Sequence, residues 1–257
     1  MSIFDDWFDI TAEAVNGHEY KSINLLDEDL KPVVEDIARL VPDHYIDPES
    51  IAHALERLGK PAAANKVRTK IPLTKRIRSG DLGEILVTEY IDDQTQYTVP
   101  IKKLRWKDHR EMAMRGEDVI GIEVFENGKR PHFLKTEAKS RAALGRQVLE
   151  DARSALDADD GRPAPHALAF VGDRLREGGD TGLADVIDDV QLKDGIARQQ
   201  MEHLLFTFTG SNPNNLQKEM LEEYGGDISQ HAVGLRIKTH QGFIADVFEE
   251  VENGLDD

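Results

Sequence analysis

Cysteine is absent from this chain of 257 residues. Without thiols, the protein can form neither a disulfide framework nor a zinc site with cysteine ligands. The histidines offer no substitute, because none of the nine lies two to four residues from another, as the HExxH motif of zinc hydrolases requires. The phosphate-binding pattern GxxxxGK[ST] is also missing, which excludes an autonomous ATPase of the P-loop type.

Long apolar runs are missing as well, and none approaches the ~20 residues needed to cross a bilayer. The first fifteen residues carry Asp5, Asp6 and Asp9, where a signal peptide would carry positive charge. We therefore expect a cytoplasmic protein. Hydrophobic residues make up 39% of the chain and charged residues 32%, the composition of an ordinary globular protein.

Positive charge is scarce overall, since the formal net charge is −17. This opposes autonomous nucleic-acid binding, which draws most of its affinity from Lys and Arg side chains that neutralise phosphates. The charge is unevenly distributed, however. Residues 66–115 hold twelve Lys and Arg against seven acidic residues, a net of +5, while both flanks are acidic. The basic segment is either a solvated face or a nucleic-acid contact, and we expect the chain alone to bind DNA weakly.

The patterning predicts a mixed α/β fold in three parts. These are an N-terminal helical region over 1–61, a core over 62–178, and a C-terminal helical extension over 179–257 that packs on the core. In the first part, we expect two helices within 26–58, broken near Pro42 and Pro48. A linker or exposed arm over 62–79 is expected to follow that part.

The core is expected to have the order α-β-β-β-α-β. Its first helix is capped by Ser79-Gly80-Asp81, and Ser140 is expected to cap the second. His166 opens the last, buried strand and is interpreted as a core histidine. The predicted strands of the core are 96–106, 118–125, 132–139 and 165–171. Beyond the core we expect helices over 196–208 and 216–224, a strand over 232–238, and an acidic C-terminal helix or tail.

Asn127-Gly128 is a strong hairpin signal between two of these strands. With these two residues as the loop, Asp118 lies directly opposite Glu137, where Cβ atoms are ~4.5–5.5 Å apart. Lys139 then lies on the same face as Glu137, and Ala138 points to the other side, beneath the following helix. Pro131 cannot donate to a ladder, so a bulged loop with a register shift of one residue is the alternative.

Two opposed carboxylates repel each other, and a divalent cation between them would reverse the sign of that interaction. We therefore predict Asp118 and Glu137 as ligands of Mg²⁺, with Mn²⁺ also supporting activity. Lys139 would orient or deprotonate a water, and Glu84 on the preceding helix is a third candidate ligand. The competing interpretation is a strand end with a solvated ion pair, and Glu84 is equally interpretable as a helix-surface glutamate.

Two neighbouring side chains have weaker claims. Glu117 is expected to face solvent, although a register slip would exchange its role with that of Asp118. Gln147 is a candidate for substrate contact, or simply a surface glutamine. The acid-x-Lys spacing occurs three times, as Glu19-Tyr20-Lys21, Asp29-Leu30-Lys31 and Glu137-Ala138-Lys139. Only the last ends an apolar strand that follows an acid-led partner strand.

The element order with Glu84, Asp118 and Glu137-Ala138-Lys139 resembles the PD-(D/E)xK nuclease superfamily, although Glu117, not Pro, precedes Asp118. More narrowly, the segments RSGDLGE (78–84), MRGED (114–118) and KTEAKS (135–140) resemble the HamA family, the nuclease subunits of the Hachiman antiphage defence system. The resemblance implies a restriction-endonuclease-like core, a Mg²⁺-dependent deoxyribonuclease activity, and a superfamily 2 helicase partner, HamB, that delivers DNA and releases the nuclease.

Two other functions stay open. A catalytically idle adaptor that docks on a nucleic-acid motor is favoured by the net charge of −17. A stand-alone restriction-type endonuclease or an RNase would use the same site chemistry. The residues do not distinguish endonuclease from exonuclease.

Overall fold

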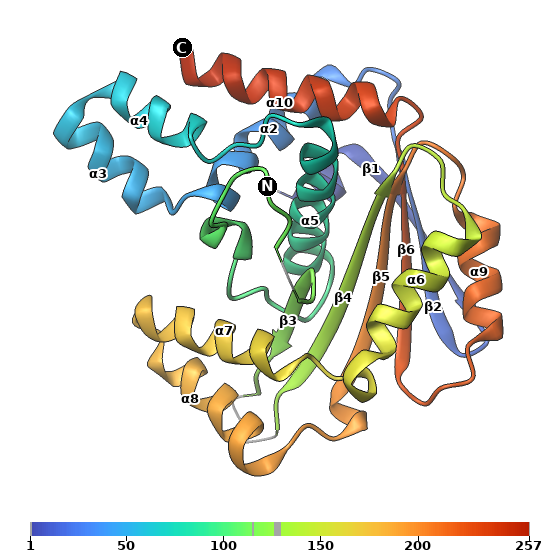
Figure 1. Ribbon diagram of the computed structural model, residues 1–257. Coiled ribbons are helices and arrows are strands. Elements are labelled where there is room, and N and C mark those ends of the chain that lie inside the picture. Colours follow the sequence, from blue (N-terminus) through green and yellow to red (C-terminus); the bar gives the residue numbers. More distant parts are fainter. Residues whose placement is uncertain (1, 115, 126–129, 257) are drawn as a thin grey trace.

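A six-stranded mixed sheet organises the molecule (Figure 1). The computed structural model describes residues 2–114, 116–125 and 130–256. The four inner strands run parallel, and an antiparallel hairpin forms each edge. In spatial order the strands are β1 (Phe8–Val15), β2 (His18–Leu25), β6 (Ser229–Arg236), β5 (Met201–Thr209), β4 (His132–Arg141) and β3 (Val119–Glu123).

Helices cover both faces of this sheet, and each face has its own apolar core. The largest core joins one face of the sheet to α2 (Lys31–Tyr45), α5 (Lys75–Gln94) and α10 (His240–Asp256), with the short helix α1 (Ile3–Trp7) beside them. On the other face lie α6 (Arg146–Asp157) and α9 (Asn214–Glu223). The helices α7 (Pro165–Glu177) and α8 (Thr181–Asp189) pack on the β3–β4 hairpin through a third cluster. The mixed α/β class predicted from the sequence is confirmed.

The N-terminal region is only partly helical, contrary to the prediction. Its first 25 residues are α1 and the β1–β2 hairpin, whose turn is Asn16-Gly17 with both φ angles positive, at 51° and 80°. Such a turn matches the twist of a hairpin. The predicted break at Pro42 is also wrong, because α2 continues through Pro42 to Tyr45. The buried apolar face of α2 compensates the hydrogen bond that proline cannot donate.

No exposed arm spans 62–79. The segment contains α4 (Lys60–Arg68), which packs on α3 (Pro48–Leu58), and the first residues of α5. Ala63, Ala64 and Val67 are buried, so a polar stretch becomes helical by tertiary packing. Because α5 starts at Lys75, the residues Ser79 and Asp81 are inside the helix and do not cap it.

Three strand or helix assignments in the core and extension are wrong. Residues 96–106 form one isolated bridge, Thr98 to Ile122, followed by a 3₁₀ turn over Lys103–Trp106. The N–H of Val99 donates to Asp92 Oδ1 at 2.7 Å. Because this side chain accepts the hydrogen bond, the N–H does not pair with a neighbouring strand. Residues 165–171 belong to α7, and the predicted helix over 196–208 is largely strand β5. A fully buried strand and a buried helix both appear as apolar runs, so periodicity does not separate them.

The other elements agree with expectation, with shifted ends. Strands near 118–125, 132–139 and 232–238 are confirmed, as are the helix over 216–224 and a C-terminal helix. The helix expected from Ser140 begins at Arg146, because β4 continues to Arg141. The order α-β-β-β-α-β is therefore replaced by α5-β3-β4-α6-α7-α8-β5.

Strands from all three predicted parts of the chain share this one sheet. The division into 1–61, 62–178 and 179–257 stays a prediction. Within the described ranges, no helix is both long enough and apolar enough to cross a membrane.

Candidate functional site

The register of the β3–β4 hairpin is the one predicted. Val119 pairs with Thr136 and Ile122 with Phe133, so the alternative with a shift of one residue is wrong. The predicted turn residues Asn127 and Gly128 lie outside the described residues. Asp118 directly precedes β3, and its Oδ2 accepts a hydrogen bond of 2.8 Å from the Ala138 backbone N–H. This bond holds the Asp118 carboxylate at the level of Glu137.

Glu137 and Lys139 lie on one face of β4 and form an ion pair. Their side chains are 14% and 22% exposed, respectively. Burial raises the pKa of the Glu137 carboxyl, and the nearby Asp118 carboxylate raises it further, against the opposing effect of Lys139. Ala138 packs against the core that contains α5, so it lies beneath the preceding helix and not, as expected, the following one.

Glu84 reaches the same region from α5. Its side chain is 14% exposed, and its Oε2 lies 3.7 Å from Lys103 Nζ. Among the described residues, that buried oxygen has no hydrogen-bond partner. Burial raises the pKa of Glu84 to about 8, and the Asp118 carboxylate contributes to the rise, while Lys103 opposes it. Glu84 is therefore not a solvated helix-surface glutamate.

The donor chemistry of these three carboxylates fits a hard divalent cation, because Mg²⁺ binds oxygen ligands. The unpartnered oxygen of Glu84 and the mutual repulsion of the acids are what a cation would relieve. In the described parts of the chain, however, no three acidic or histidine side chains converge closely enough to hold a metal ion. Two oxygens are already engaged, Asp118 Oδ2 by Ala138 and Glu137 Oε1 by Lys139. The second oxygen of each carboxylate, Asp118 Oδ1 and Glu137 Oε2, is the one that a cation could take.

A cavity of about 240 Å³ opens beside Asp118, between the start of β3 and α7. Lys103 and His166 line it together with apolar side chains. His166 lies exposed in the first turn of α7, so its interpretation as a core histidine is wrong. The cavity gives a small molecule or a phosphate group access to the Asp118 carboxylate.

Glu117 does not face solvent as expected. Its side chain is 6% exposed, accepts a hydrogen bond of 2.7 Å from the Ala164 N–H, and lies 3.7 Å from Lys135 Nζ. It fixes the segment that leads into α7. Gln147 is exposed and hydrogen-bonded to Asp151 at 3.0 Å, as expected of a surface glutamine.

Two lysines near the carboxylates were not singled out from the sequence. Lys103 donates to the Glu117 carbonyl at 2.6 Å and lies near Glu84. Lys135 is 2% exposed and donates to the carbonyls of Ala158 and Arg162. Strand parity could have identified Lys135, since it shares the face of Glu137 at a spacing of two residues. No local pattern identifies Lys103, which approaches Glu84 only through the tertiary fold.

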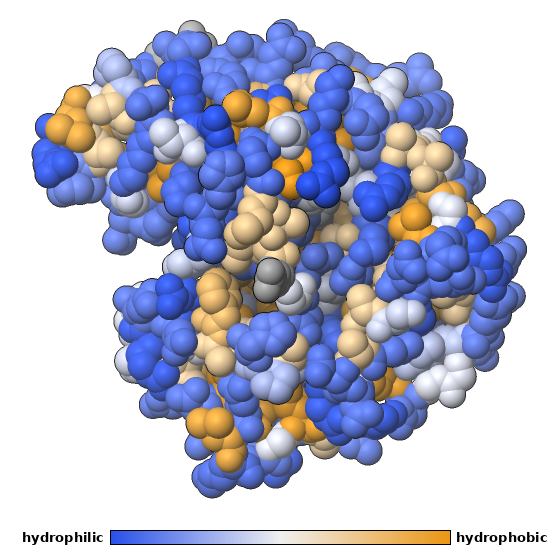
Figure 2. All heavy atoms as spheres, in the orientation of Figure 1, coloured by the Kyte–Doolittle hydropathy of each residue, from blue (hydrophilic) through white to orange (hydrophobic). Residues whose placement is uncertain are grey.

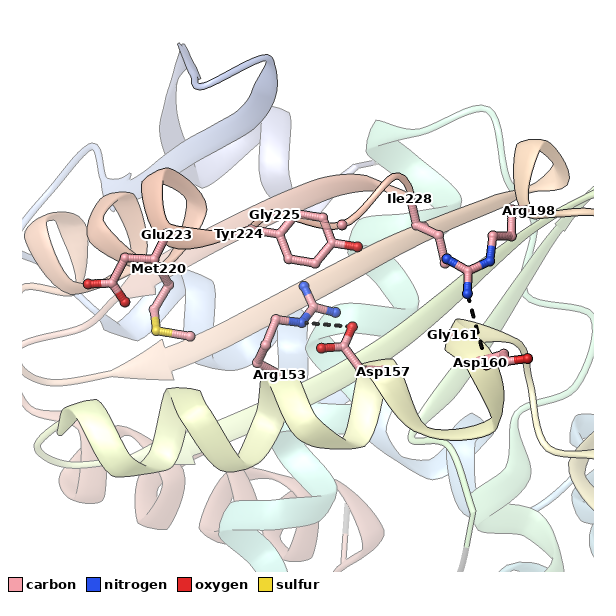
Figure 3. A pocket seen from close by; sticks show the side chains of 11 residues that line it. Arg153, Asp157, Asp160, Gly161, Arg198, Met220, Glu223, Tyr224, Gly225 and Ile228 are labelled. Carbon is pink, nitrogen blue, oxygen red and sulfur yellow. Dashed lines mark ion pairs between the residues drawn. The ribbon is translucent and has the colours of Figure 1, made fainter.

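A second cavity, of about 490 Å³, lies near α6 and α9 (Figure 3). Its charged groups are mostly neutralised by one another. Arg153 pairs with Asp157 at 3.4 Å and Arg198 with Asp160 at 3.9 Å, as the dashed lines show. None of the predicted site residues lines this cavity, so the carboxylate cluster remains the candidate site.

Comparison with known proteins identifies the family. The HamA family model matches residues 1–251. A relative, the Hachiman protein HamA of Bacillus cereus, is 24% identical over 184 residues, which are 72% of this chain and 64% of the relative. The match thus spans less than two thirds of that relative's own length. Because the family model covers nearly the whole sequence, this chain belongs to the HamA family.

Proposed function

We propose that this chain is a Mg²⁺-dependent deoxyribonuclease that serves antiphage defence as a component of the Hachiman system. The observation that carries the proposal is the grouping of Asp118, Glu137 and Glu84 at the start of β3, with Lys139 beside them. Family membership and the relative's name as a Hachiman protein support the biological setting. We further propose that the sheet with α5 and α6 is a variant of the PD-(D/E)xK core.

The residues divide the chemistry of phosphodiester hydrolysis among them. Asp118, Glu137 and Glu84 would hold the cation, and Lys139, once released from Glu137, would orient the attacking water or stabilise charge on the phosphate. Lys103, near Glu84, supplies a second positive charge toward the same cavity. A divalent cation bound there contributes charge neutralisation and acidification of water.

A partner would complete the activity. The net charge of −17 opposes autonomous binding to DNA. We propose that a superfamily 2 helicase of the HamB type delivers the DNA, raising its local concentration at the carboxylate cluster. The ion pair between Lys139 and Glu137 would keep the site inactive until the DNA and the cation arrive.

The test is cleavage of linear and plasmid DNA with Mg²⁺ or Mn²⁺, with and without the helicase. Glu137→Ala combined with Lys139→Ala should lower the rate at least ~100-fold, since single charge-stabilising groups contribute 10²–10³. The matched control is Glu19→Ala with Lys21→Ala, which removes an acid-x-Lys ion pair of 3.3 Å from another strand. Undiminished cleavage by the first variant, with both variants folded, would refute the site. A panel including RNA distinguishes a deoxyribonuclease from an RNase.

One observation favours a second function, a catalytically idle adaptor. No metal-binding group of three side chains is preformed among the described residues, and Lys139 neutralises Glu137. Titration calorimetry with Mn²⁺ separates the two functions. The nuclease should take up the ion in a manner that Asp118→Asn weakens, and the adaptor should give no binding heat that depends on Asp118.

A further inference from the structure

A cleft of about 640 Å³ lies between the α3–α4 pair and α7, near the proposed site. Figure 1 shows these helices at the left of the molecule, α3 and α4 above and α7 and α8 below. The space-filling view is hollowed at the same place (Figure 2). The 3₁₀ turn Lys103–Trp106 forms part of the wall of the cleft. The cleft is thus built by segments far apart in the chain.

Four cationic side chains from separate elements line this cleft, namely Lys66, Lys70, Arg105 and Arg174. Lys66 donates to Ser50, at 3.1 Å to the carbonyl and 2.6 Å to the hydroxyl. Lys70 has no ion-pair partner within the described ranges. Among the residues that the structure describes, neither lysine therefore forms an ion pair.

The three acidic side chains of the cleft are already in use. Asp47 caps α3 through the Ser50 N–H and lies 3.5 Å from Arg105. Asp180 caps α8 through the Leu183 N–H. Glu177 pairs with Arg174 at 2.8 Å. A polyanion entering the cleft therefore meets Lys66 and Lys70, while each carboxylate of the cleft is already held by a hydrogen bond or an ion pair.

An aromatic platform accompanies the charge. Trp106 lines the cleft half-buried, with its ring edge-on to Phe170 at 5.9 Å. The Arg174 guanidinium lies 5.9 Å from the Trp106 ring and 5.6 Å from the Phe170 ring. The buried Arg174 Nε has no hydrogen-bond acceptor among the described residues. An indole beside a guanidinium is the arrangement on which unpaired bases stack.

The cleft leads toward the carboxylates. Ile101 lines both the cleft and the 240 Å³ cavity at Asp118. The contact between Trp106, in the cleft, and Phe170, in the cavity, joins their walls. The cleft and the cavity at Asp118 therefore share part of their walls.

We propose that this cleft binds a single strand of DNA and guides it to Asp118, an inference that rests on the proposed nuclease function. Lys66 and Lys70 contact phosphates, and Trp106 stacks on a base. The volume favours a single strand, because pockets of ~300–1,000 Å³ enclose a drug-sized ligand and not a duplex. A duplex presents no exposed base face to Trp106.

The experiment measures binding of a fluorescein-labelled single strand of ~12 nucleotides, within the usual site size, to the full chain in EDTA. Lys66→Ala with Lys70→Ala should weaken binding about tenfold at low salt and reduce the salt slope by ~0.7 per lysine. Trp106→Leu should weaken it about 5- to 100-fold, with no effect on a duplex of the same sequence. The matched control is Lys31→Ala with Lys238→Ala, which removes two lysines that are 81% and 75% exposed elsewhere.

The outcomes separate the two proposals. If the cleft variants lose binding but the wild type never cleaves DNA, the cleft stands and the nuclease proposal falls. If the wild type cleaves and the cleft variants bind and cleave equally well, the cleft inference is wrong. It is equally wrong if the wild type does not bind the single strand at low salt, or if Trp106→Leu weakens single strand and duplex alike.

Discussion

Two glutamates on α5, Glu84 and Glu89, show what distinguishes the candidate site at the scale of single residues. Glu89 is 15% exposed and lies 2.6 Å from His44 Nε2 and 2.9 Å from Lys102 Nζ. Although burial opposes it, these partners lower the pKa of Glu89 to about 2. Glu84 is equally buried but lacks a hydrogen bond to Oε2, and its pKa is raised. The fold therefore stabilises the charged form of Glu89 and disfavours the charged form of Glu84.

Glu84→Gln should therefore stabilise the metal-free protein. A carboxyl whose pKa is about 8 when folded and near 4.5 when unfolded binds its proton more tightly in the folded state, so stability falls as pH rises between these values. The glutamine variant avoids this loss. We expect its free energy of unfolding in EDTA to exceed that of the wild type by roughly 1–3 kcal/mol at pH 8, and the advantage to vanish near pH 4.5.

Urea unfolding at several pH values measures this difference. Glu249→Gln, an exposed position on α10, is the control and should change stability at neither pH. A Glu84→Gln variant less stable than the wild type at pH 8 would mean that Lys103 compensates Glu84 fully. In that case the carboxylate would be structural and its role at the site would be lost.

At the scale of elements, close packing around β3 positions Asp118. A Cβ added at Gly121 would lie 3.0 Å from Tyr97 Cβ and 3.2 Å from Leu134 Cβ. Gly121→Ala should therefore push the 96–106 segment away from the strand and destabilise the protein by about 1–3 kcal/mol. Thermal or urea unfolding measures the change.

Gly254→Ala is the matched control for this packing prediction. Its Cβ would meet nothing within 4 Å, and the residue lies in α10. Alanine there should stabilise by about 0.5–1 kcal/mol through helix propensity. Equal effects of the two substitutions would show that β3 has no such close contact.

The β3–β4 hairpin and its register could be predicted because the signals are local. Alternation along 118–125 and 132–139 determines which residues share a face, and the pairing determines that Asp118 meets Glu137. The β1–β2 hairpin carried the same kind of signal in Asn16-Gly17, between two runs that both became strands. Attention to that dipeptide would have corrected the helical assignment of the N-terminus.

The elements that were missed depend on distant neighbours. Strand β5 lies between β4 and β6 and is buried on both faces, so it has the apolar continuity of a buried helix. Helix α7 begins at Pro165, and Leu168, Val171 and Leu175 lie on its buried side. The cleft could not be predicted from the sequence for the same reason, because it is the tertiary fold that brings Lys70, Trp106 and Arg174 to its walls.

At the scale of the whole molecule, charge is separated as well as unbalanced. The segment 66–115 carries a net of +5 within a chain of net −17, and it supplies Lys66, Lys70 and Arg105 to the cleft. We expect the acidic remainder to repel nucleic acid from other faces, which would concentrate any DNA contact at this cleft. The two proposals are therefore compatible. The helicase would raise the local concentration of DNA, and the cleft would guide a single strand to Asp118.

The single sheet also bears on whether the predicted core, residues 62–178, can fold alone. That fragment contains β3 and β4 but lacks β5, whose pairing with β4 extends from Phe133–Met201 to Arg141–Thr209. Without β5, a strand that is central in the whole chain becomes an exposed edge. We expect the isolated fragment to show no cooperative thermal unfolding and poorly dispersed amide resonances, while the full chain unfolds in one transition. A folded fragment with a cooperative transition would instead establish 62–178 as an independent domain, and the shared sheet would then be a docking of parts that fold separately.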